Sequence, residues 1–227
     1  AAMMNASRIT GIPLANMSVV INGAGAAGYA IAKLLRCQDE DDRCMPVGKV
    51  RVCDSSGILA PSRPNLNEYK ADLARWTNPD DEQGDLRDAL RGAHAFIGVS
   101  KGGLLNADDI RTMAKDPIVL AMANPTPEIM PEEAEAGGAR IIGTGRSDFP
   151  NQVNNVLAFP GLFRGALQAR ATCFTSAMKF AAIEAIAASA GEPSPKRVLP
   201  TAFDRSVAVA VADRVAAAAQ QSGVCLA

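Results

Sequence analysis

The sequence has no excess of either charge and no long uninterrupted apolar run. Lysine and arginine total 23 and aspartate and glutamate total 24, so the formal net charge is −1. This balance provides no electrostatic footprint for nucleic acid or for an anionic membrane surface. The nearest approach to a spanning segment, residues 207–219, is interrupted by Asp213 and Arg214. Because a membrane-spanning helix needs about 18 apolar residues, none is predicted.

Histidine is nearly absent, and the cysteines form no C-x-x-C pair. The only histidine is His94, and no residue near it has the spacing of zinc ligands, which argues against a zinc site. The cysteine count is odd, and a chain of 227 residues needs no covalent staples. We therefore expect reduced thiols and a cytoplasmic location. The five cysteines are Cys37, Cys44, Cys53, Cys173 and Cys225.

A secretory signal is missing as well. The first residues, AAMMNASRITG, lack the charged and apolar regions of a signal peptide. They look instead like the interior and end of a helix that stops at Gly11. This pattern predicts that the chain begins partway through a larger protein.

The sequence does contain short apolar runs that alternate with segments of helical periodicity. Hydrophobic residues make up 48% and charged residues 21%, which suits a folded core rather than disorder. We expect strands at residues 18–22, 49–54, 95–99 and 118–123 and one that starts at 140–142, with helices at 27–35, 67–76, 85–90, 107–114 and 131–136. The alternation predicts an α/β fold, a Rossmann-type doubly wound parallel sheet covered on both faces.

The last third of the chain carries no strand signal. Ala-rich helices are expected at residues 156–169, 172–190 and 203–221, and the proline-rich stretch GEPSPKRVLP separates the last two. We therefore predict three regions. They are the end of a linking helix from an N-terminal domain (1–17), a dinucleotide-binding domain (18–165) and a C-terminal helical extension packed on it (166–227).

A glycine-rich turn, GAGAAG at residues 23–28, joins the first strand of the sheet to the helix that follows. The motif is weak alone, but here it has the required strand before it and helix after it. Its glycines allow a tight turn, an approach of the backbone to a pyrophosphate and close helix–strand packing, and the helix N-terminus supplies N–H donors. We assign cofactor contacts to Gly23, Gly25, Ala26, Ala27 and Gly28.

Asp54 ends the second strand, where an acid can bond the ribose hydroxyls of a dinucleotide. A cap or turn residue before Ser55 is the alternative. An acid at this place favours NAD, because a 2′-phosphate would meet a like charge. Arg63 and Lys70 lie just downstream and could bind such a phosphate, although we slightly favour a solvated loop and helix face for them. The cofactor is NAD or NADP, with NAD slightly favoured.

Polar side chains also follow the next two strands. Ser100 ends the run GVS, and Asn124 opens the run NPTPE. Ligands of an open α/β sheet lie outside the carboxyl ends of its strands, so both residues belong on the binding rim. The proline after Asn124 disfavours helical backbone and aims its amide, and the alternative for an Asn-Pro pair is an Asx turn. His94 and Tyr29 are interpreted as a satisfied histidine and a packing residue.

Five segments in this order carry a resemblance to a known family: VVINGAGAAGYAIAKLL, VCDSSGI, FIGVS, ANPTPEI and GRSDFPNQVNNVLAFPGLFRGAL. They resemble the cofactor domain of the malic enzymes, in particular the compact bacterial and archaeal type. The resemblance covers practically the whole chain, and its last two segments are the specific ones. It implies oxidation of L-malate with NAD or NADP and decarboxylation to pyruvate and CO₂, with Mg²⁺ or Mn²⁺ bound in the full-length enzyme.

The resemblance gives a role to the amide-rich loop NQVNN at residues 151–155. It implies that Asn124 and Asn155 contact malate and the nicotinamide end of the cofactor, with Asn154 beside them. Neutral amides can donate to a carboxylate or hydroxyl and accept from a carboxamide. We expect Asn151 and Gln152 to hold the loop in place instead.

The resemblance also implies what this chain does not supply. In the family, the proton-donating tyrosine, the base lysine and the metal-binding carboxylates come from an N-terminal domain and the segment that joins it. We therefore assign no catalytic residue and no metal ligand here, Asp54 and Asp148 included, and expect the chain to be inactive alone and the full-length enzyme to be a homodimer. The acidic insert at residues 39–43 is longer than usual and is expected on the surface.

Two other functions stay open. Another Rossmann oxidoreductase with a complete site would need Tyr29, Lys70 or Lys101 as its acid or base. A non-catalytic dinucleotide-binding module would use the asparagine loop only as structure, and malate would then leave its cofactor affinity unchanged.

Overall fold

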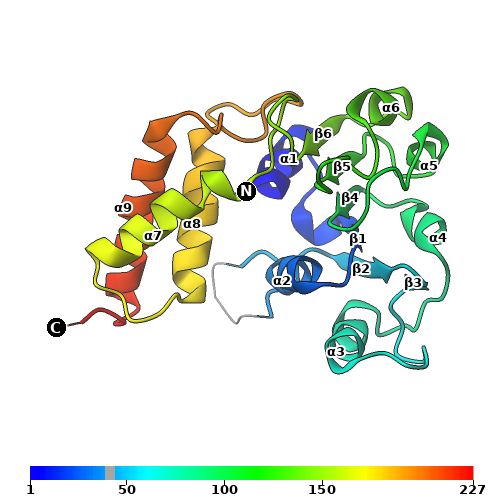
Figure 1. Cartoon of the computed structure of the whole chain (residues 1–227), viewed down its shortest axis with the longest axis horizontal. Helices are drawn as coiled ribbons and strands as arrows, with labels where there is room; N and C mark the ends of the chain where they lie inside the picture. The colour runs from blue at the N-terminus through cyan, green and yellow to red at the C-terminus, as the bar shows by residue number, and fades with distance from the viewer. Residues whose placement is uncertain (39–43, 227) are drawn as a thin grey trace.

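A six-stranded sheet forms the centre of the computed structural model, which describes residues 1–38 and 44–226 (Figure 1). Its strand order is β3-β2-β1-β4-β5-β6, and all pairs are parallel except β2 with β3. The strands are β1 Ser18–Asn22, β2 Lys49–Asp54, β3 Gly57–Ile58, β4 Ala95–Gly98, β5 Ile118–Ala121 and β6 Ile141–Thr144. The predicted Rossmann-type sheet is confirmed. Only β3 was not predicted, because two residues carry no periodicity.

Helices connect the strands within a few residues of the predicted positions. They are α1 Ala2–Thr10, α2 Ala26–Leu35, α3 Glu68–Thr77, α4 Leu86–Leu90, α5 Ala107–Arg111, α6 Pro131–Ala136, α7 Phe159–Gln168, α8 Ser176–Ser189 and α9 Arg205–Gln221, with 3₁₀ turns η1 Leu14–Asn16 and η2 Asn155–Leu157. Helix α1 ends at Gly11, whose φ of 71° is the left-handed conformation that glycine adopts at a helix C-terminus. Among the described residues, no helix is both long and apolar enough to span a membrane.

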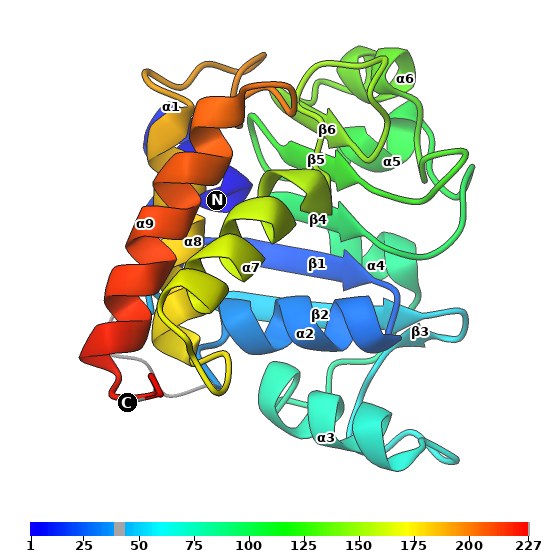
Figure 2. The ribbon, with the colours of Figure 1, turned by 60° about the vertical axis from the view of Figure 1, so that its left-hand side comes forward.

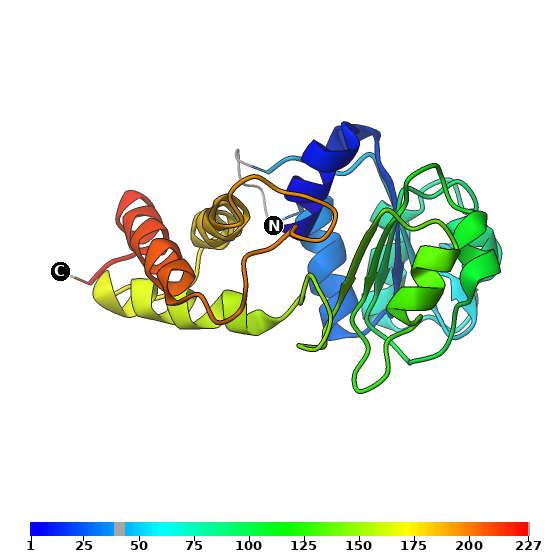
Figure 3. The same cartoon turned by 90° about the horizontal axis from the view of Figure 1, so that it is seen from above.

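Helices cover both faces of the sheet. Seen from above, α1 and α2 lie on one side of the strands and α5 and α6 on the other (Figure 3). Successive residues of a strand point to opposite faces, so each strand contributes to two cores. One core contains Ile21, Ile97 and Leu120, and the other contains Val20, Phe96 and Val119. This double burial is why the strands have continuous apolar runs.

The last three helices form a layer beside the sheet, in which α7 and α8 both pack on α9 (Figures 1 and 3). Glycine lets α7 and α9 approach closely. A Cβ atom on Gly161 would lie 2.5 Å from Val211 Cβ, and one on Gly165 would lie 2.4 Å from the Ala212 carbonyl oxygen. The predicted boundary between residues 165 and 166 falls inside α7, and the division into domains stays a prediction.

The prediction of reduced thiols is wrong for two of the five cysteines. Cys37, just after α2, forms a disulfide with Cys44, and their Cα atoms are 5.7 Å apart. The prediction rested on cysteine count and compartment, whereas pairing depends on the distance to which the fold brings two side chains. Cys53, Cys173 and Cys225 are free, as expected. The acidic insert between the paired cysteines, residues 39–43, lies outside the described residues.

Candidate functional site

The glycine turn after β1 lies at the edge of the sheet toward which the parallel strands point (Figure 2). Gly25 is the N-cap of α2, and no side chain caps this helix. A Cβ atom built on Gly25 meets nothing within 4 Å, and Gly25, Ala26 and Ala27 are exposed. The first N–H groups of α2 therefore face open space. An uncapped helix N-terminus with room beside it suits a pyrophosphate.

The other two glycines of the motif are required by packing. Gly23 has a φ of 126°, and a Cβ atom there would lie 2.6 Å from the Val99 carbonyl oxygen. A Cβ atom on Gly28 would lie 1.7 Å from the Gly23 carbonyl oxygen. The predicted tight turn and close helix–strand packing are thus confirmed. Contact of the turn with a cofactor stays a prediction.

Asp54 lies at the end of β2, as predicted, but its carboxylate is fully engaged. Oδ2 accepts a hydrogen bond from Lys70 Nζ at 2.7 Å, and Oδ1 accepts from Arg63 Nη2 at 3.1 Å and from the Ser56 N–H at 2.9 Å. Burial would raise the pKa of Asp54, but the hydrogen bonds from Lys70 and Ser56 and the charge of Arg63 outweigh it. The pKa of Asp54 is therefore held below its ordinary value.

The prediction that Arg63 and Lys70 form a solvated loop and helix face is wrong. Their side chains are 17% and 30% exposed, and both are turned onto Asp54. Two cations against one carboxylate leave this cluster with a net charge of +1. A 2′-phosphate on the ribose would therefore not meet an unpaired acid. The electrostatic reason for favouring NAD over NADP disappears.

A hydrogen-bond network links the loops that follow β1, β4 and β5. Asn22, the buried last residue of β1, donates from Nδ2 to Ser100 Oγ at 2.7 Å. The Ser100 N–H donates to Glu128 Oε1 at 2.9 Å, and the Ala123 N–H donates to Glu128 Oε2 at 3.0 Å. No role was predicted for Asn22 or Glu128. The sequence does not show which group a polar residue at a strand end will bind. The only sequence signal was that Asn22 is a polar residue at the end of a mainly apolar strand.

Asn151 has the structural role that was predicted for it. Its side chain is buried, and Nδ2 donates to the carbonyl oxygens of Ile142 and Pro195. Its Oδ1 accepts from the Val198 N–H at 2.8 Å. Asn151 thereby ties the loop after β6 to the segment between α8 and α9. The neighbouring Gln152 forms a parallel bridge with the end of β6.

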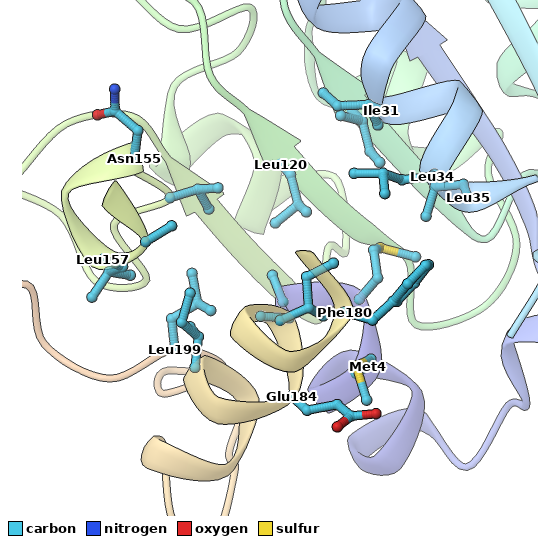
Figure 4. A pocket seen from close by; sticks show the side chains of 18 of the residues that line it. Met4, Ile31, Leu34, Leu35, Leu120, Asn155, Leu157, Phe180, Glu184 and Leu199 are labelled. Carbon is cyan, nitrogen blue, oxygen red and sulfur yellow. The ribbon is translucent and has the colours of Figure 1, made fainter. Parts of the chain in front are cut away.

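The three asparagines predicted to bind ligands differ from one another. Asn154 caps η2 by accepting the Val156 N–H at 3.1 Å, which is a structural role. Asn124 and Asn155 are exposed. Within the described part of the chain, neither has a side-chain hydrogen bond, so both amides are available to a ligand. The amide of Asn155 points away from the apolar side chains around Leu120 (Figure 4).

The loops that carry these two asparagines lie against each other. Arg146, in the loop after β6, donates from Nη1 to the Pro125 carbonyl oxygen at 3.5 Å. A Cβ atom on Gly145 would lie 3.2 Å from the Met122 carbonyl oxygen. The peptide bond between Asn124 and Pro125 is cis. The loop of Asn124 and the segment that leads from β6 to Asn155 thus meet at the carboxyl ends of β5 and β6.

Comparison with known proteins identifies this arrangement. The family described as malic enzyme, NAD-binding domain, matches residues 1–220. The chain belongs to the malic enzyme family.

Individual malic enzymes match along nearly the whole chain. The bifunctional malic/malolactic enzyme of Bacillus subtilis is 52% identical over 227 residues, which cover 99% of this chain and 54% of that protein. The NAD-dependent malic enzyme of Geobacillus stearothermophilus is 42% identical, over 99% of this chain and 46% of that protein. The chain spans about half the length of these two relatives. Other relatives are named NADP-dependent malic enzymes.

A solved malic enzyme has the same fold. The crystal structure of the NAD-dependent malic enzyme from Thermotoga maritima superposes with a TM-score of 0.88 at 46% sequence identity. The match covers 95% of this chain and 55% of that one. The α/β sheet described above is therefore the NAD-binding domain of a malic enzyme, and its glycine turn, with open space at Gly25, fits a dinucleotide.

An apolar cavity of about 390 Å³ lies behind the asparagine loop of this malic enzyme domain (Figure 4). Side chains of α1, α2, β4, β5 and α8 line it, among them Ile31, Leu120 and Phe180. Among the described residues that line it, none is a lysine, arginine or histidine whose side chain could bind a carboxylate. The described lining is thus mainly apolar and provides no side-chain cation for the two carboxylates of malate.

Two of the three side chains that another oxidoreductase would need as acid or base are engaged elsewhere. Tyr29 donates its hydroxyl to Asp72 Oδ2 at 2.8 Å, and this hydrogen bond is the main reason that the pKa of Tyr29 is raised. Lys70 is bound to Asp54. His94 Nδ1 accepts the Ser18 N–H at 3.0 Å, which confirms the predicted satisfied histidine. The alternative of a complete site within this chain loses two of its three candidates.

The described residues do not fit the divalent metal of the malic enzymes. Within residues 1–38 and 44–226, no group of three His, Cys, Asp or Glu side chains is arranged to hold a metal ion. The assignment of Mg²⁺ or Mn²⁺ to residues outside this chain stays a prediction.

Proposed function

We propose that this domain holds NAD or NADP across the carboxyl ends of β1, β4 and β5 for the oxidative decarboxylation of L-malate to pyruvate and CO₂. One observation carries the proposal. The uncapped N-terminus of α2, open at Gly25, follows the carboxyl end of β1, and two exposed asparagine amides without a hydrogen-bond partner in the described part of the chain lie in the segments after β5 and β6. Relatives named for malate chemistry support the choice of substrate.

The residues of this chain bind and orient rather than transfer protons. The first N–H groups of α2 bind the pyrophosphate. The cluster of Asp54, Arg63 and Lys70 binds the ribose, and its positive charge also admits a 2′-phosphate. Bound NAD(P) would supply the acceptor for the hydride that leaves the hydroxyl-bearing carbon of the substrate. The amides of Asn124 and Asn155 hold the reacting groups in contact without adding charge, which lowers the entropic part of the barrier.

Decarboxylation needs groups that we place outside these 227 residues. An acid must protonate the product carbon, and a metal must stabilise the enolate oxygen. We propose that an N-terminal part of the malic enzyme supplies both, and that the full-length enzyme is a homodimer. The domain alone would then bind cofactor without turnover.

A binding and activity assay tests this proposal. The purified chain is titrated with NADH and with NADPH by nucleotide fluorescence, with and without malate, and assayed for turnover with malate, NAD(P) and Mn²⁺. We expect cofactor binding, an affinity that malate changes, and no sustained turnover. Asn155→Ala should abolish the malate effect, whereas Asn151→Ala should act through stability because Asn151 is buried. Binding that malate never affects would indicate a non-catalytic module, and robust turnover would show that the site is complete within this chain.

A further inference from the structure

Glu128 is a buried carboxylate that the proposed mechanism does not use. Its side chain is fully buried, with a relative exposure of 0%. Both oxygens accept hydrogen bonds from main-chain N–H groups, and within the described residues no lysine or arginine forms an ion pair with it. Burying a carboxylate without a cation is costly. A core position with no further task would be served better by an apolar residue.

The two N–H groups that Glu128 binds occupy related positions. Ser100 lies two residues beyond the end of β4, and Ala123 lies two residues beyond the end of the adjacent β5, directly before Asn124. At these points the sheet no longer supplies partners for the main chain. The carboxylate replaces them with one acceptor that serves both loops, at 2.9 and 3.0 Å.

The rest of Glu128 is held as firmly as its carboxylate. Its carbonyl oxygen accepts the N–H groups of Leu104 and Leu105 at 2.8 and 3.0 Å. Gly98 also packs against this side chain. A Cβ atom on Gly98 would lie 2.3 Å from the carboxylate carbon of Glu128. The glycine at the end of β4 therefore leaves the space that the carboxylate occupies.

We propose that Glu128 is a positioning residue that fixes Ser100 and Asn124 relative to each other at the carboxyl ends of β4 and β5, where the cofactor is proposed to bind. The inference rests on the proposed function, since it concerns how the same rim is held. Asn22 extends the network to the glycine turn through its hydrogen bond to Ser100 Oγ at 2.7 Å. One carboxylate thereby couples the loops of three neighbouring strands, β1, β4 and β5. Loss of this coupling leaves the fold intact but lets Asn124 move away from the nicotinamide.

The test compares Glu128→Gln with the wild-type chain. Glutamine has the same size, but its amide group faces one N–H with a donor instead of an acceptor. We expect about a ten-fold weaker affinity for NADH, a smaller effect of malate on that affinity, and faster hydrogen–deuterium exchange in the peptides that contain Ser100 and Ala123. Glu132 on α6 is exposed, and Glu132→Gln, the matched control, should change none of these three measurements.

A second variant should displace the carboxylate of Glu128 without any change to that residue. Gly98→Ala places a methyl group where the carboxylate lies and should displace it, with a similar loss of NADH affinity. The double variant should lose much less than the product of the two single losses, because both act on one contact.

Two results would overturn the proposal that Glu128 is a positioning residue. A lower Tm for Glu128→Gln with unchanged NADH affinity of the folded protein would show a purely structural carboxylate and overturn the proposal, as would independent losses in the double variant. If the wild-type chain itself bound neither NADH nor NADPH, the proposed function would fall and this inference with it.

Discussion

Single residues set the charge at the ribose end of the site. Asp54 alone would repel a 2′-phosphate, but Arg63 and Lys70 lie on its carboxylate and reverse the sign of the cluster. The same two contacts hold the pKa of Asp54 low against the opposing effect of burial. Cofactor choice in this domain is thus a property of three side chains together and not of the acid alone.

Removal of Lys70 should shift cofactor preference toward NAD. In Lys70→Ala the cluster loses one positive charge next to the position of a 2′-phosphate, while Asp54 keeps Arg63. For partly exposed groups, the loss of attraction is about 1 kcal/mol, or about five-fold in the Kd for NADPH. The Kd for NADH should change less. Fluorescence titrations of both nucleotides at low and high salt measure the difference, with Lys101→Ala, in the loop after β4, as a control. A proportional change for both nucleotides would contradict the assignment.

Among the elements, the turn from β1 to α2 contains one glycine that packing requires and another that leaves space for a ligand. Gly28 packs against the Gly23 carbonyl oxygen with no room for a side chain, whereas Gly25 faces open space with a φ of −85° that other residues adopt. The two glycines occur in one motif for different physical reasons. Substitution of each should therefore have a different signature.

Gly25→Ala should leave the fold intact and weaken the binding of the cofactor. The added methyl group meets no protein atom, so the free energy of unfolding should stay within about 0.5 kcal/mol. It occupies the approach of a pyrophosphate to α2, and we expect about a ten-fold weaker NADH affinity. Gly28→Ala should lower the free energy of unfolding by about 2 kcal/mol or more, since overpacking forces the backbone to move. Urea unfolding together with NADH titration resolves the two effects, and equal stability losses would contradict the separation.

The whole molecule presents an apolar face on its C-terminal layer. Phe159, Phe163 and Leu167 recur every four residues on α7 and are 47%, 51% and 78% exposed. The rings of Phe159 and Phe163 lie 5.7 Å apart, and Phe174 packs edge-on against Phe163. Soluble monomers rarely expose a contiguous apolar patch of this kind.

We expect the isolated chain to self-associate through this face at high concentration. The double substitution Phe163→Ser with Leu167→Gln removes the centre and one end of the stripe without touching the side of α7 that packs on α9. It should reduce the concentration-dependent increase in sedimentation coefficient. Tyr69→Ser, which removes an aromatic residue that is 69% exposed on α3, is the control. Unchanged association in the double variant, or equal loss in the control, would assign the contact to another surface.

The sequence by itself determined the order of elements, the parallel sheet and the place of the cofactor turn. These depend on local properties: strand runs such as residues 18–22, the start of a helix at Asn67 and the helix stop at Gly11, each of which acts through neighbours in the chain.

Only the tertiary structure decided which side chains share a partner. The pairing of Asp54 with Lys70, the contact of Glu128 with two loops and the disulfide between Cys37 and Cys44 depend on distances through space. A hydrogen bond or an ion pair acts only over a few ångströms, and spacing along the chain does not specify that separation. The sequence therefore predicted where the rim would form, and the fold decided which of its groups remain available to a ligand.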